Sequence, residues 1–389
     1  MTAPRGLPRA EFAARCAKAQ VEMARAGLGA LLLTTEVELR YYTGFLTRFW
    51  ESPTRPWFVI VPSAGAPIAV IPSIGAHLMG QTWVEDIRTW SAPDYGDDGI
   101  GLLAETLREV VPDAGAIGLA SHLESHVRIP RADLHRLEAA LGARRLIDDA
   151  AITWRLRTIK SEPEIAKITA AVAVADRAFA RVDEIAGAGV PLEQVFRRFQ
   201  MLCLEEGADW VPYLAGAAGR GGYRDVISPA TEAPLQPGDV LMLDTGVIRD
   251  GYFCDFDRNY SVGPPSAAVA SAHARLIEAV DAGLAAARPG ARFADLFHAM
   301  NAVVRPSGPP DASASEAGRL GHGLGLQLTE GPSIIPGDDT VLAPGMVLTL
   351  EPGVDMGGGK IMVHEEDIVI REGGAVCLSR RAGREIVVI

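Results

Sequence analysis

The chain has 389 residues, of which 48% are hydrophobic and 22% charged, and its formal net charge is −12. This length and composition are typical of a globular protein of about two or three domains and exclude a disordered or fibrous chain. The acidic balance argues against nucleic acid and against an anionic membrane surface as partners, because both need a basic face. No apolar run approaches the roughly 20 residues of a membrane-spanning helix.

The cysteine pattern favours a reducing compartment. None of the four cysteines stands in a CxxC pair, which argues against a zinc knuckle or a redox motif. The segment 1–20 carries an acidic residue and lacks a long apolar run, so it predicts a helix rather than a signal peptide. We therefore expect a cytoplasmic protein.

The first part of the chain alternates short apolar runs with helical stretches. The runs at 29–35, 57–63, 67–73 and 116–121 are bounded by Gly, Pro or Ser and predict buried strands. The segments before and after them have helical spacing, which predicts an α/β domain with a sheet of about five or six strands. The composition changes near residue 150, and we place a domain boundary there, giving domains 1–152 and 153–389.

The second part opens with a long helix whose start is marked in the sequence. Ser161 and Glu164 have the spacing of a capping box, and Pro163 stands in the first turn, where its missing N–H costs nothing. A second helix is expected over 192–207, with Gly207 as its C-cap. Strands, a hairpin and two more helices follow, together with a Pro/Ser/Gly loop at 305–318.

The segment 238–263 predicts two strands joined by a tight turn at Asp250–Gly251. Pairing about this turn places Asp244 opposite Asp257 and Gly246 opposite Asp255, so all four residues share one face. Asp244 and Asp255 become diagonal neighbours with Cβ atoms roughly 7–8 Å apart. Because Asp244 ends an apolar run, its carboxylate needs a counter-charge, and a cation would supply one.

The residues of this hairpin have two other interpretations. The aspartates could be turn or capping residues with one of them salt-bridged, and on the hairpin alone this is as good an explanation. The tripeptide 244–246 also matches the motif of aspartic proteases, but no second copy of that motif exists here and the surroundings are helical.

Three further acidic or imidazole side chains lie downstream. His322 stands between glycines, Glu351 ends the apolar strand 346–353, and Glu365 and Glu366 occupy opposite faces of the strand 361–370, so that one of them must point inward. Each has an ordinary explanation when taken alone, as a loop histidine or a strand terminus. As a set, four carboxylates and one imidazole suit two divalent ions such as Mn²⁺, Co²⁺, Fe²⁺ or Zn²⁺.

The order and spacing of these residues resemble the pita-bread metallohydrolase family, which includes methionine aminopeptidase, aminopeptidase P, prolidase and creatinase. The matching motifs are LDTG…GYFCD, GHGLG, LEPG and HEED, and YYTGF at 41–45 resembles the amino-terminal domain of the creatinase and prolidase branch. The resemblance implies an α/β amino-terminal domain followed by an α+β pita-bread catalytic domain. It also implies that two metal ions are held by five residues: Asp244, Asp255, His322, Glu351 and Glu365, with Asp255 and Glu365 bridging.

The chain also departs from this family pattern. Family peptidases carry a histidine shortly before the first aspartate, whereas no histidine lies between His135 and His273. They usually carry a second histidine seven residues after the first, where this chain has Thr329, and a threonine where it has Asp257. We expect the segment 213–229 to substitute for the lost groups.

Several residues are predicted substrate contacts on these grounds. Three stand in the glycine-rich segment 213–229, where an arginine could clamp a carboxylate, and two stand in the segment 48–57, which in the creatinase-like branch caps the site of a neighbouring protomer. A solvated loop explains either segment equally well, and the capping role implies a homodimer. The substrate-binding candidates are Tyr223, Arg220, Arg224, Thr329, Asp257, Trp50 and Arg55.

The resemblance implies a water, activated by two metal ions, that attacks an amide carbonyl, with Glu351 relaying its proton and Glu351 and His322 as catalytic residues. The preferred substrate is a short peptide with a bond before proline. Because two histidines are missing, a non-peptidase relative acting on a small charged nitrogen or sulfur compound is the alternative, as in creatinase, ectoine hydrolase or a sulfonium lyase. A binding protein on an inactive hydrolase fold is the third possibility, and the complete ligand set argues against it.

Overall fold

The computed structural model describes residues 4–52, 55–306 and 318–389, so most of the predicted loop 305–318 lies outside the described residues. The chain forms two compact units. The amino-terminal unit is Arg5–Arg157, and the carboxy-terminal unit is Thr158–Ile389 together with Pro4. Residue 152, the predicted boundary, is the first residue of helix α6 (Ile152–Thr158).

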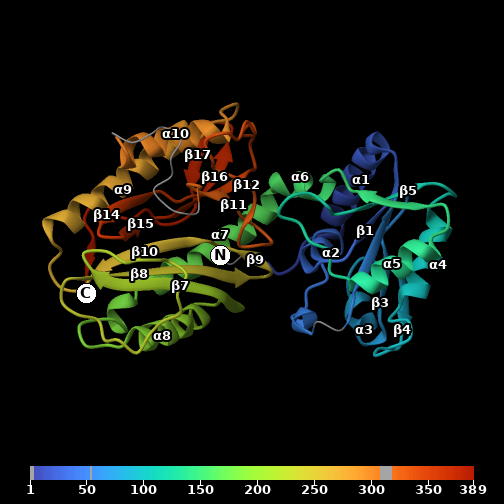
Figure 1. Cartoon of the computed structure of the whole chain (residues 1–389), viewed down its shortest axis with the longest axis horizontal. Coiled ribbons are helices and arrows are strands. Elements are labelled where there is room, and N and C mark those ends of the chain that lie inside the picture. Colours follow the sequence, from blue (N-terminus) through green and yellow to red (C-terminus); the bar gives the residue numbers. More distant parts are fainter. Residues whose placement is uncertain (1–3, 53–54, 307–317) are drawn as a thin grey trace. The chain divides into compact units, whose positions relative to one another are not determined.

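The amino-terminal unit is built on one mixed sheet with the strand order β4-β3-β2-β1-β5-β6 (Figure 1). Its strands are β1 (Leu28–Leu33), β2 (Phe58–Pro62), β3 (Ile68–Pro72), β4 (Asp86–Trp90), β5 (Ala116–Leu119) and β6 (Arg145–Asp148). Its helices before α6 are α1 (Arg9–Ala26), α2 (Glu36–Thr43), α3 (Ala76–Met79), α4 (Ile100–Val110) and α5 (Arg131–Ala140). The four predicted strands and the α/β class are confirmed.

Strand β1 explains why the predicted runs are continuously apolar. Alternate residues of β1, Ala30 and Leu32, pack with α4 and α5 in one buried cluster. The residues between them, Leu31 and Leu33, are also buried and therefore lie on the opposite face of the sheet. A strand covered on both faces has no polar face to show, which is why no alternation is visible in the sequence.

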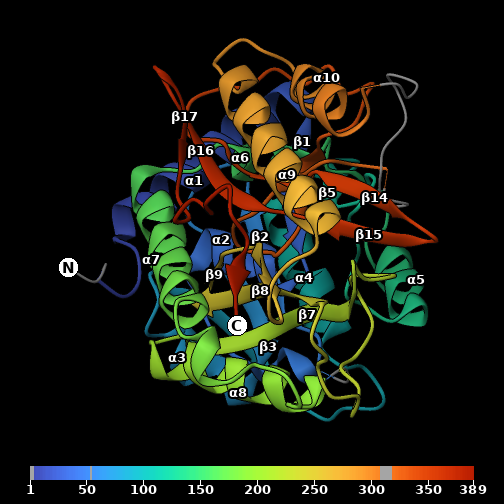
Figure 2. The same cartoon turned by 90° about the vertical axis from the view of Figure 1, so that its left-hand side faces the viewer.

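In the part of the carboxy-terminal unit that the structure describes, there are four main helices: α7 (Glu162–Phe179), α8 (Leu192–Glu205), α9 (Ala267–Ala286) and α10 (Phe293–Val304). The predicted start of α7 is confirmed, since the Glu164 carboxylate accepts the Ser161 backbone N–H at 3.0 Å. Gly207 follows the end of α8 with a φ of +107°, a conformation that favours glycine. Helices α7 and α8 pack against one sheet, and α9 packs against the other (Figure 2).

Two five-stranded sheets are formed by the described residues of this unit. The first has the order β18-β10-β8-β7 with β9 beside β8, and the second has the order β12-β11-β13-β16-β17. Strands β14 and β15 form a separate hairpin. The strands are β7 (Trp210–Arg220), β8 (Asp239–Arg249), β9 (Tyr252–Phe253), β10 (Phe256–Ser261), β11 (His322–Gly323), β12 (Glu330–Ser333), β13 (Val347–Leu350), β14 (Gly353–Gly357), β15 (Lys360–Val363), β16 (Glu366–Arg371), β17 (Gly374–Cys377) and β18 (Val387–Val388).

The predicted register of the hairpin in the first sheet is confirmed. Asp244 of β8 pairs directly with Asp257 of β10. The turn is formed by Asp250 and Gly251 with φ values of +51° and +81°, as a two-residue hairpin turn with positive φ at both positions requires. Turn chemistry at two residues thus decides which side chains of both strands face inward.

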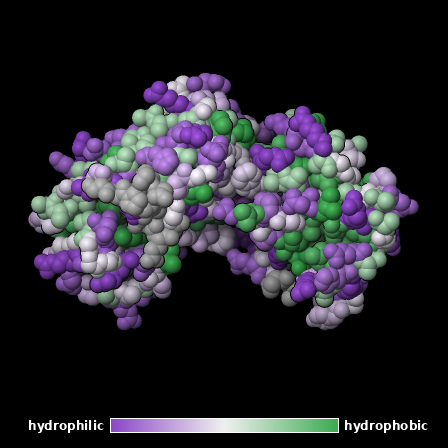
Figure 3. Space-filling model, turned by 45° about the horizontal axis from the view of Figure 1, so that its top comes forward, coloured by the Kyte–Doolittle hydropathy of each residue, from purple (hydrophilic) through white to green (hydrophobic). Residues whose placement is uncertain are grey.

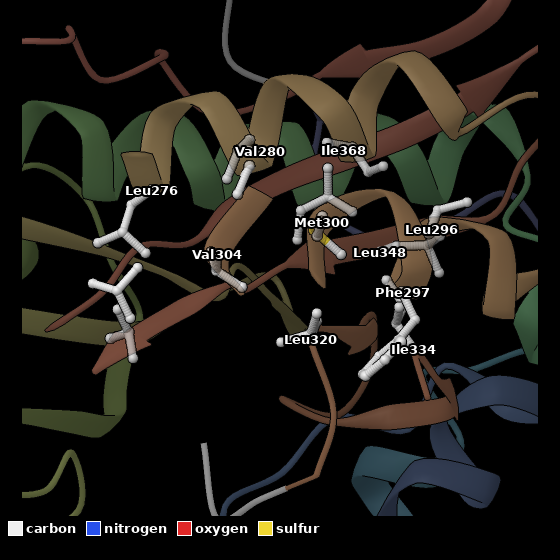
Figure 4. Packing of buried hydrophobic residues seen from close by; sticks show 14 of the residues in the cluster. Leu276, Val280, Leu296, Phe297, Met300, Val304, Leu320, Ile334, Leu348 and Ile368 are labelled. Carbon is white, nitrogen blue, oxygen red and sulfur yellow. The ribbon is translucent and has the colours of Figure 1, made fainter. Parts of the chain in front are cut away.

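The second sheet is oriented by its hydrophobic face. Leu348 of β13 and Ile368 of β16 pack in one cluster with Leu296 and Met300 of α10 (Figure 4). Fully burying each such side chain stabilises the fold by about 1.5–3 kcal/mol, so this face cannot turn outward cheaply. Because side chains alternate along a strand, the polar residues next to them, among them Thr349 and Asp367, face the other way.

The surface shown in Figure 3 mixes hydrophilic and hydrophobic residues over both units. Among the residues that the structure describes, no helix combines the length and the apolar character needed to cross a membrane.

Candidate metal centre

Three of the five predicted ligands meet in a buried cluster. Asp255 precedes β10, His322 lies in β11 and Glu365 precedes β16. Each offers a ligand atom, and these three atoms all lie within 4.8 Å of one another. The Nε2 atom of His322 is 3.4 Å from the Asp255 carboxylate. Side chains from both sheets therefore converge on one point.

The other two predicted ligands flank this trio. Leu350 pairs with Glu366, and continuing that register by one residue places Glu351 opposite Glu365. Burial, and then the charges of Asp257 and Glu351, raise the pKa of Asp244 well above its ordinary value. Burial, and then Asp255, Glu351 and Asp244, do the same for Glu365.

Unsatisfied oxygens show that this cluster suits a cation. Asp244 Oδ1 and Glu365 Oε1 are buried and have no hydrogen-bond partner among the described residues. A buried carboxylate oxygen without a donor or counter-charge is strongly disfavoured. Divalent ions would satisfy both atoms, and the donor set of four carboxylates and one imidazole is the kind that such ions take. The residues present therefore fit the implied metal ions.

The hydrogen bonds of His322 fix which nitrogen is available. Its Nδ1–H donates to the backbone carbonyl of Gly323 at 2.8 Å, which leaves the lone pair of Nε2 directed at Asp255. Burial, followed by the charge of Arg319, lowers the pKa of His322 to about 3. A neutral imidazole held in this tautomer is the form that ligates metals.

Glu351 shares the buried, acidic surroundings of the other predicted ligands. Burial, with a smaller contribution from the charge of Asp257, raises the pKa of Glu351 to about 7, although Arg319 opposes the shift.

Two ligands are oriented by residues that the sequence did not identify. The hydroxyl of Tyr213 donates to Asp244 Oδ2 at 3.0 Å, and the backbone N–H of His322 donates to Thr349 Oγ1 at 3.2 Å. Tyr213 lies on β7, next to β8, and a period-two pattern in β7 would be the only sign of it in the sequence. The first contact fixes the rotamer of Asp244, and the second holds the main chain at His322.

The two sheets are tied together by a reciprocal brace, formed by Asp257 and Asp367. Asp257 Oδ1 accepts the backbone N–H of Glu365 at 3.1 Å, and Asp367 Oδ2 accepts the backbone N–H of Asp255 at 3.0 Å. Each acid stands two residues after one predicted ligand and holds the main chain of another. The brace therefore fixes Asp255 and Glu365 relative to each other.

Arg319 lies beside the cluster and was not predicted. Its Nη2 atom is 3.5 Å from Thr329 Oγ1, and its charge lowers the pKa of Glu351 and of Asp255 against the larger effect of burial. Arg319 is half-buried, and no carboxylate among the described residues lies within 4.0 Å of its guanidinium. The positively charged guanidinium of Arg319 thus lies beside Thr329, at the position where the family pattern has a histidine.

Glu330, next to Thr329, belongs to a buried ion pair. Its Oε2 atom is 3.1 Å from Lys160 Nζ, and its Oε1 atom accepts the backbone N–H groups of Leu326 and Gln327 at 2.8 and 3.1 Å. These bonds shape the loop that follows His322.

The predicted substrate contacts of the segment 213–229 lie elsewhere. Tyr223 is buried, donating its hydroxyl to Asn259 and accepting the N–H of Val363, so its phenol braces strands rather than facing a cavity. Arg220 is exposed at the end of β7, about 16 Å along the strand from the residue paired with Asp244, at 3.3 Å per residue. Arg220 therefore lies away from the predicted ligands along β7, and its predicted contact with the substrate stays a prediction.

Arg224 is also exposed, and its guanidinium lies beside Gly359 in the turn between β14 and β15. The sequence placed these arginines by their distance along the chain, whereas the direction of β7 carries Arg220 away from the ligands. Glycine-rich loops offer no periodicity from which such a direction could be predicted.

Trp50 and Arg55 belong to the amino-terminal unit. Trp50 lies in a short 3₁₀ helix at Phe49–Glu51, with the Arg128 guanidinium 5.2 Å from its ring centre. Arg55 stacks over Phe49 at 5.4 Å. Their predicted contact with the site of a second protomer stays a prediction.

Comparisons with known proteins agree with this geometry. Residues 166–372 match the model of metallopeptidase family M24, and residues 15–159 match the creatinase/prolidase N-terminal domain. The chain is 30% identical to the probable dipeptidase PepE of Mycobacterium tuberculosis over 97% of this chain and 96% of the relative. It is 31% identical to the Xaa-Pro dipeptidase of Pyrococcus furiosus, over 60% of this chain and 66% of the relative.

Solved structures are similar over nearly the whole chain. Dipeptidase PepE from Mycobacterium ulcerans superimposes with a TM-score of 0.83 at 28% identity, covering 98% of this chain and 99% of that one. The X-Pro aminopeptidase from Thermotoga maritima gives a TM-score of 0.80 at 25% identity, covering 96% and 99%.

Proposed function

Because this chain belongs to metallopeptidase family M24, we propose that it hydrolyses short peptides at an Xaa-Pro bond, using two divalent metal ions held by the five predicted ligands. The family membership confirms the predicted resemblance, the creatinase-like and pita-bread architecture and the assignment as a hydrolase. Relatives bear the names dipeptidase and Xaa-Pro dipeptidase, which do not favour the non-peptidase alternative.

One observation carries the proposal: Asp255, His322 and Glu365 present ligand atoms within 4.8 Å of one another, inside a protein interior. Asp244 and Glu365 each have a buried carboxylate oxygen without a hydrogen-bond partner among the described residues. Because these two ligands come from different sheets, they support more than one bound cation. Two ions, when bound, would supply a water of lowered pKa and would polarise the substrate carbonyl.

The residues of this chain would then divide the work. Glu351 would take the proton of the attacking water and return it to the leaving nitrogen, which its place opposite Glu365 in the strand register supports. His322 would stay neutral and would hold its ion through Nε2. Tyr213 would keep Asp244 in place through its hydroxyl and would itself stay protonated, because burial and then Asp244 raise its pKa.

Arg319 and Thr329 would orient the substrate in place of the missing histidine. A half-buried guanidinium without a carboxylate partner among the described residues can hold a free carboxylate in a bidentate fork. The terminal carboxylate of a dipeptide is such a group. Arg319→Lys should then raise KM for Xaa-Pro dipeptides about tenfold with a smaller change in kcat, because the charge stays while the fork is lost. The same KM for both proteins would contradict this role.

The proposal is tested with purified protein stripped of metal and reloaded with Mn²⁺, Co²⁺, Fe²⁺ or Zn²⁺. We expect two equivalents of metal and metal-dependent release of proline from Xaa-Pro dipeptides, with Ala-Ala as the control substrate. Absence of cleavage of every Xaa-Pro peptide by metal-loaded protein would defeat the peptidase proposal. The homodimer stays a prediction, which light scattering of the purified protein checks. The cytoplasmic location also stays a prediction.

A further inference from the structure

Asp257 occupies a position on the metal-binding face that the five-ligand set does not use. It lies in β10 directly opposite Asp244 in β8 and is only 1% exposed. Side chains paired in this way have Cβ atoms about 4.5–5.5 Å apart. Its carboxylate is therefore a close neighbour of a predicted ligand and is out of reach of solvent.

The two oxygens of Asp257 have different surroundings. Oδ1 accepts the backbone N–H of Glu365 at 3.1 Å and lies 3.2 Å from Nδ1 of His364. Oδ2 is buried and has no hydrogen-bond partner among the described residues. One oxygen thus completes the brace, and the other retains lone pairs that nothing in the described protein satisfies.

Strand geometry places Asp257 on the side of the cluster formed by Asp244, because the two residues are paired across β10 and β8. Its Oδ1 also accepts the N–H of Glu365, which belongs to the trio of Asp255, His322 and Glu365. Asp244 and Asp257 therefore bring two carboxylates to this side of the cluster.

His364 does not remove the need for a further cation. Its Nε2 atom lies 3.2 Å from Glu366 and its Nδ1 atom 3.2 Å from Asp257 Oδ1, so both ring nitrogens face carboxylate oxygens other than Asp257 Oδ2. Arg258 also pairs with Glu366 at 2.9 Å. These contacts hold Asp257 Oδ1 in place but do not reach Oδ2.

We propose that Asp257 is a sixth member of the ion-holding set, contributing Oδ2 as a further carboxylate oxygen to the cation on the Asp244 side. This inference rests on the proposed function. Carboxylate oxygens suit hard ions such as Mn²⁺, whereas imidazole nitrogen favours Zn²⁺. Asp257 therefore biases this one position toward Mn²⁺, while the position served by His322 keeps its affinity for both ions.

The test is metal binding itself, measured by calorimetric titration of metal-free protein with Mn²⁺ and, separately, with Zn²⁺. Asp257→Asn keeps an acceptor oxygen for the Glu365 N–H and removes the charge, and Asp257→Thr restores the residue of the family pattern. We expect both variants to bind one of two Mn²⁺ ions about 10–100-fold more weakly, with a smaller loss for Zn²⁺. The control is Asp355→Asn, which removes an exposed charge from β14.

Three outcomes separate the possibilities. Two Mn²⁺ sites of unchanged affinity in Asp257→Asn would overturn the inference while leaving the proposed function intact. No metal binding by the parent protein would defeat the proposed function. Because Asp257 also braces the two sheets, circular dichroism and unfolding of each variant accompany the titration. If Asp257→Asn does not fold, Asp257→Thr decides, and a Mn²⁺-to-Zn²⁺ affinity ratio equal to that of the parent would refute the inference.

Discussion

The buried ion pair of Lys160 and Glu330 allows one prediction to be worked through in detail. The two side chains are 3% and 5% exposed, and their charged atoms are 3.1 Å apart. Lys160→Met keeps most of the volume of the side chain and removes its charge. The Glu330 carboxylate then stays buried without the lysine charge, while the backbone N–H groups of Leu326 and Gln327 still donate to it.

The expected loss of folding stability depends on whether the buried charge that remains still has a partner of opposite charge. Breaking a buried pair by removing one partner destabilises proteins by about 3–5 kcal/mol, because the remaining charge is uncompensated. The double variant Lys160→Met/Glu330→Gln has no charge left, and glutamine still offers a carbonyl oxygen to Leu326 and Gln327. It should therefore recover most of the loss and lie within about 1–2 kcal/mol of the parent.

Urea unfolding of metal-free protein measures both variants, with the slope m checked for each. The carboxy-terminal unit should lose the full amount in the single variant, and the metal affinity of the His322 side should fall as well, because the loop after His322 is held by Glu330. A loss below about 1 kcal/mol in the single variant, or a double variant no more stable than the single one, would refute the reasoning.

Three other predictions concern the ligands, the pH dependence and the backbone. Asp255→Ala should bind neither metal ion and should be inactive; plasma emission analysis that finds two equivalents would contradict the ligand assignment. Burial lowers the pKa of His273 to about 4, so the folded state binds fewer protons than the unfolded state between pH 4 and 6.5. Stability should therefore fall by up to about 3 kcal/mol as pH drops through that window, and His273→Gln, which can still donate to the Gly383 carbonyl, should lose this dependence in pH-resolved urea titrations. Gly321 has a φ of +139°, and a Cβ there would lie 2.2 Å from the Thr349 carbonyl oxygen. Gly321→Ala should cost at least about 2 kcal/mol and impair metal binding, and unaltered stability and affinity would show that this backbone can relax.

Local rules predicted the parts of the site that depend on strand periodicity. The turn at Asp250–Gly251 fixes the hairpin register, and this register alone places Asp244 opposite Asp257. The helix start at Ser161 and the buried strands of the amino-terminal unit follow from equally local signals. These features were predictable because the residues that determine them are neighbours in the sequence.

Long-range neighbours could not be predicted in the same way. Tyr213 on β7 donates to Asp244 on the neighbouring strand β8, and Asp367 accepts the N–H of Asp255, which lies 112 positions away in the sequence. The guanidinium of Arg319 contacts the Thr329 hydroxyl, and the sequence between these residues has no periodic pattern that would predict the contact. The composition of the glycine-rich segment around Arg220 indicates a loop but not the direction in which that loop runs. Contacts of this kind depend on how the two sheets come together, which the resemblance to a family indicates only for its shared residues.

The reciprocal hydrogen bonds of Asp257 and Asp367 have a consequence for how the folded protein acquires its metal ions. Small zinc domains fold only when their ion arrives, so chelation unfolds them. Here the main chain of Asp255 and Glu365 is pinned by groups that need no ion, and a large apolar core supports both sheets. The metal-binding site should therefore be formed before any metal binds. Removal of the metal should yield a folded but inactive protein that regains activity when metal is added back.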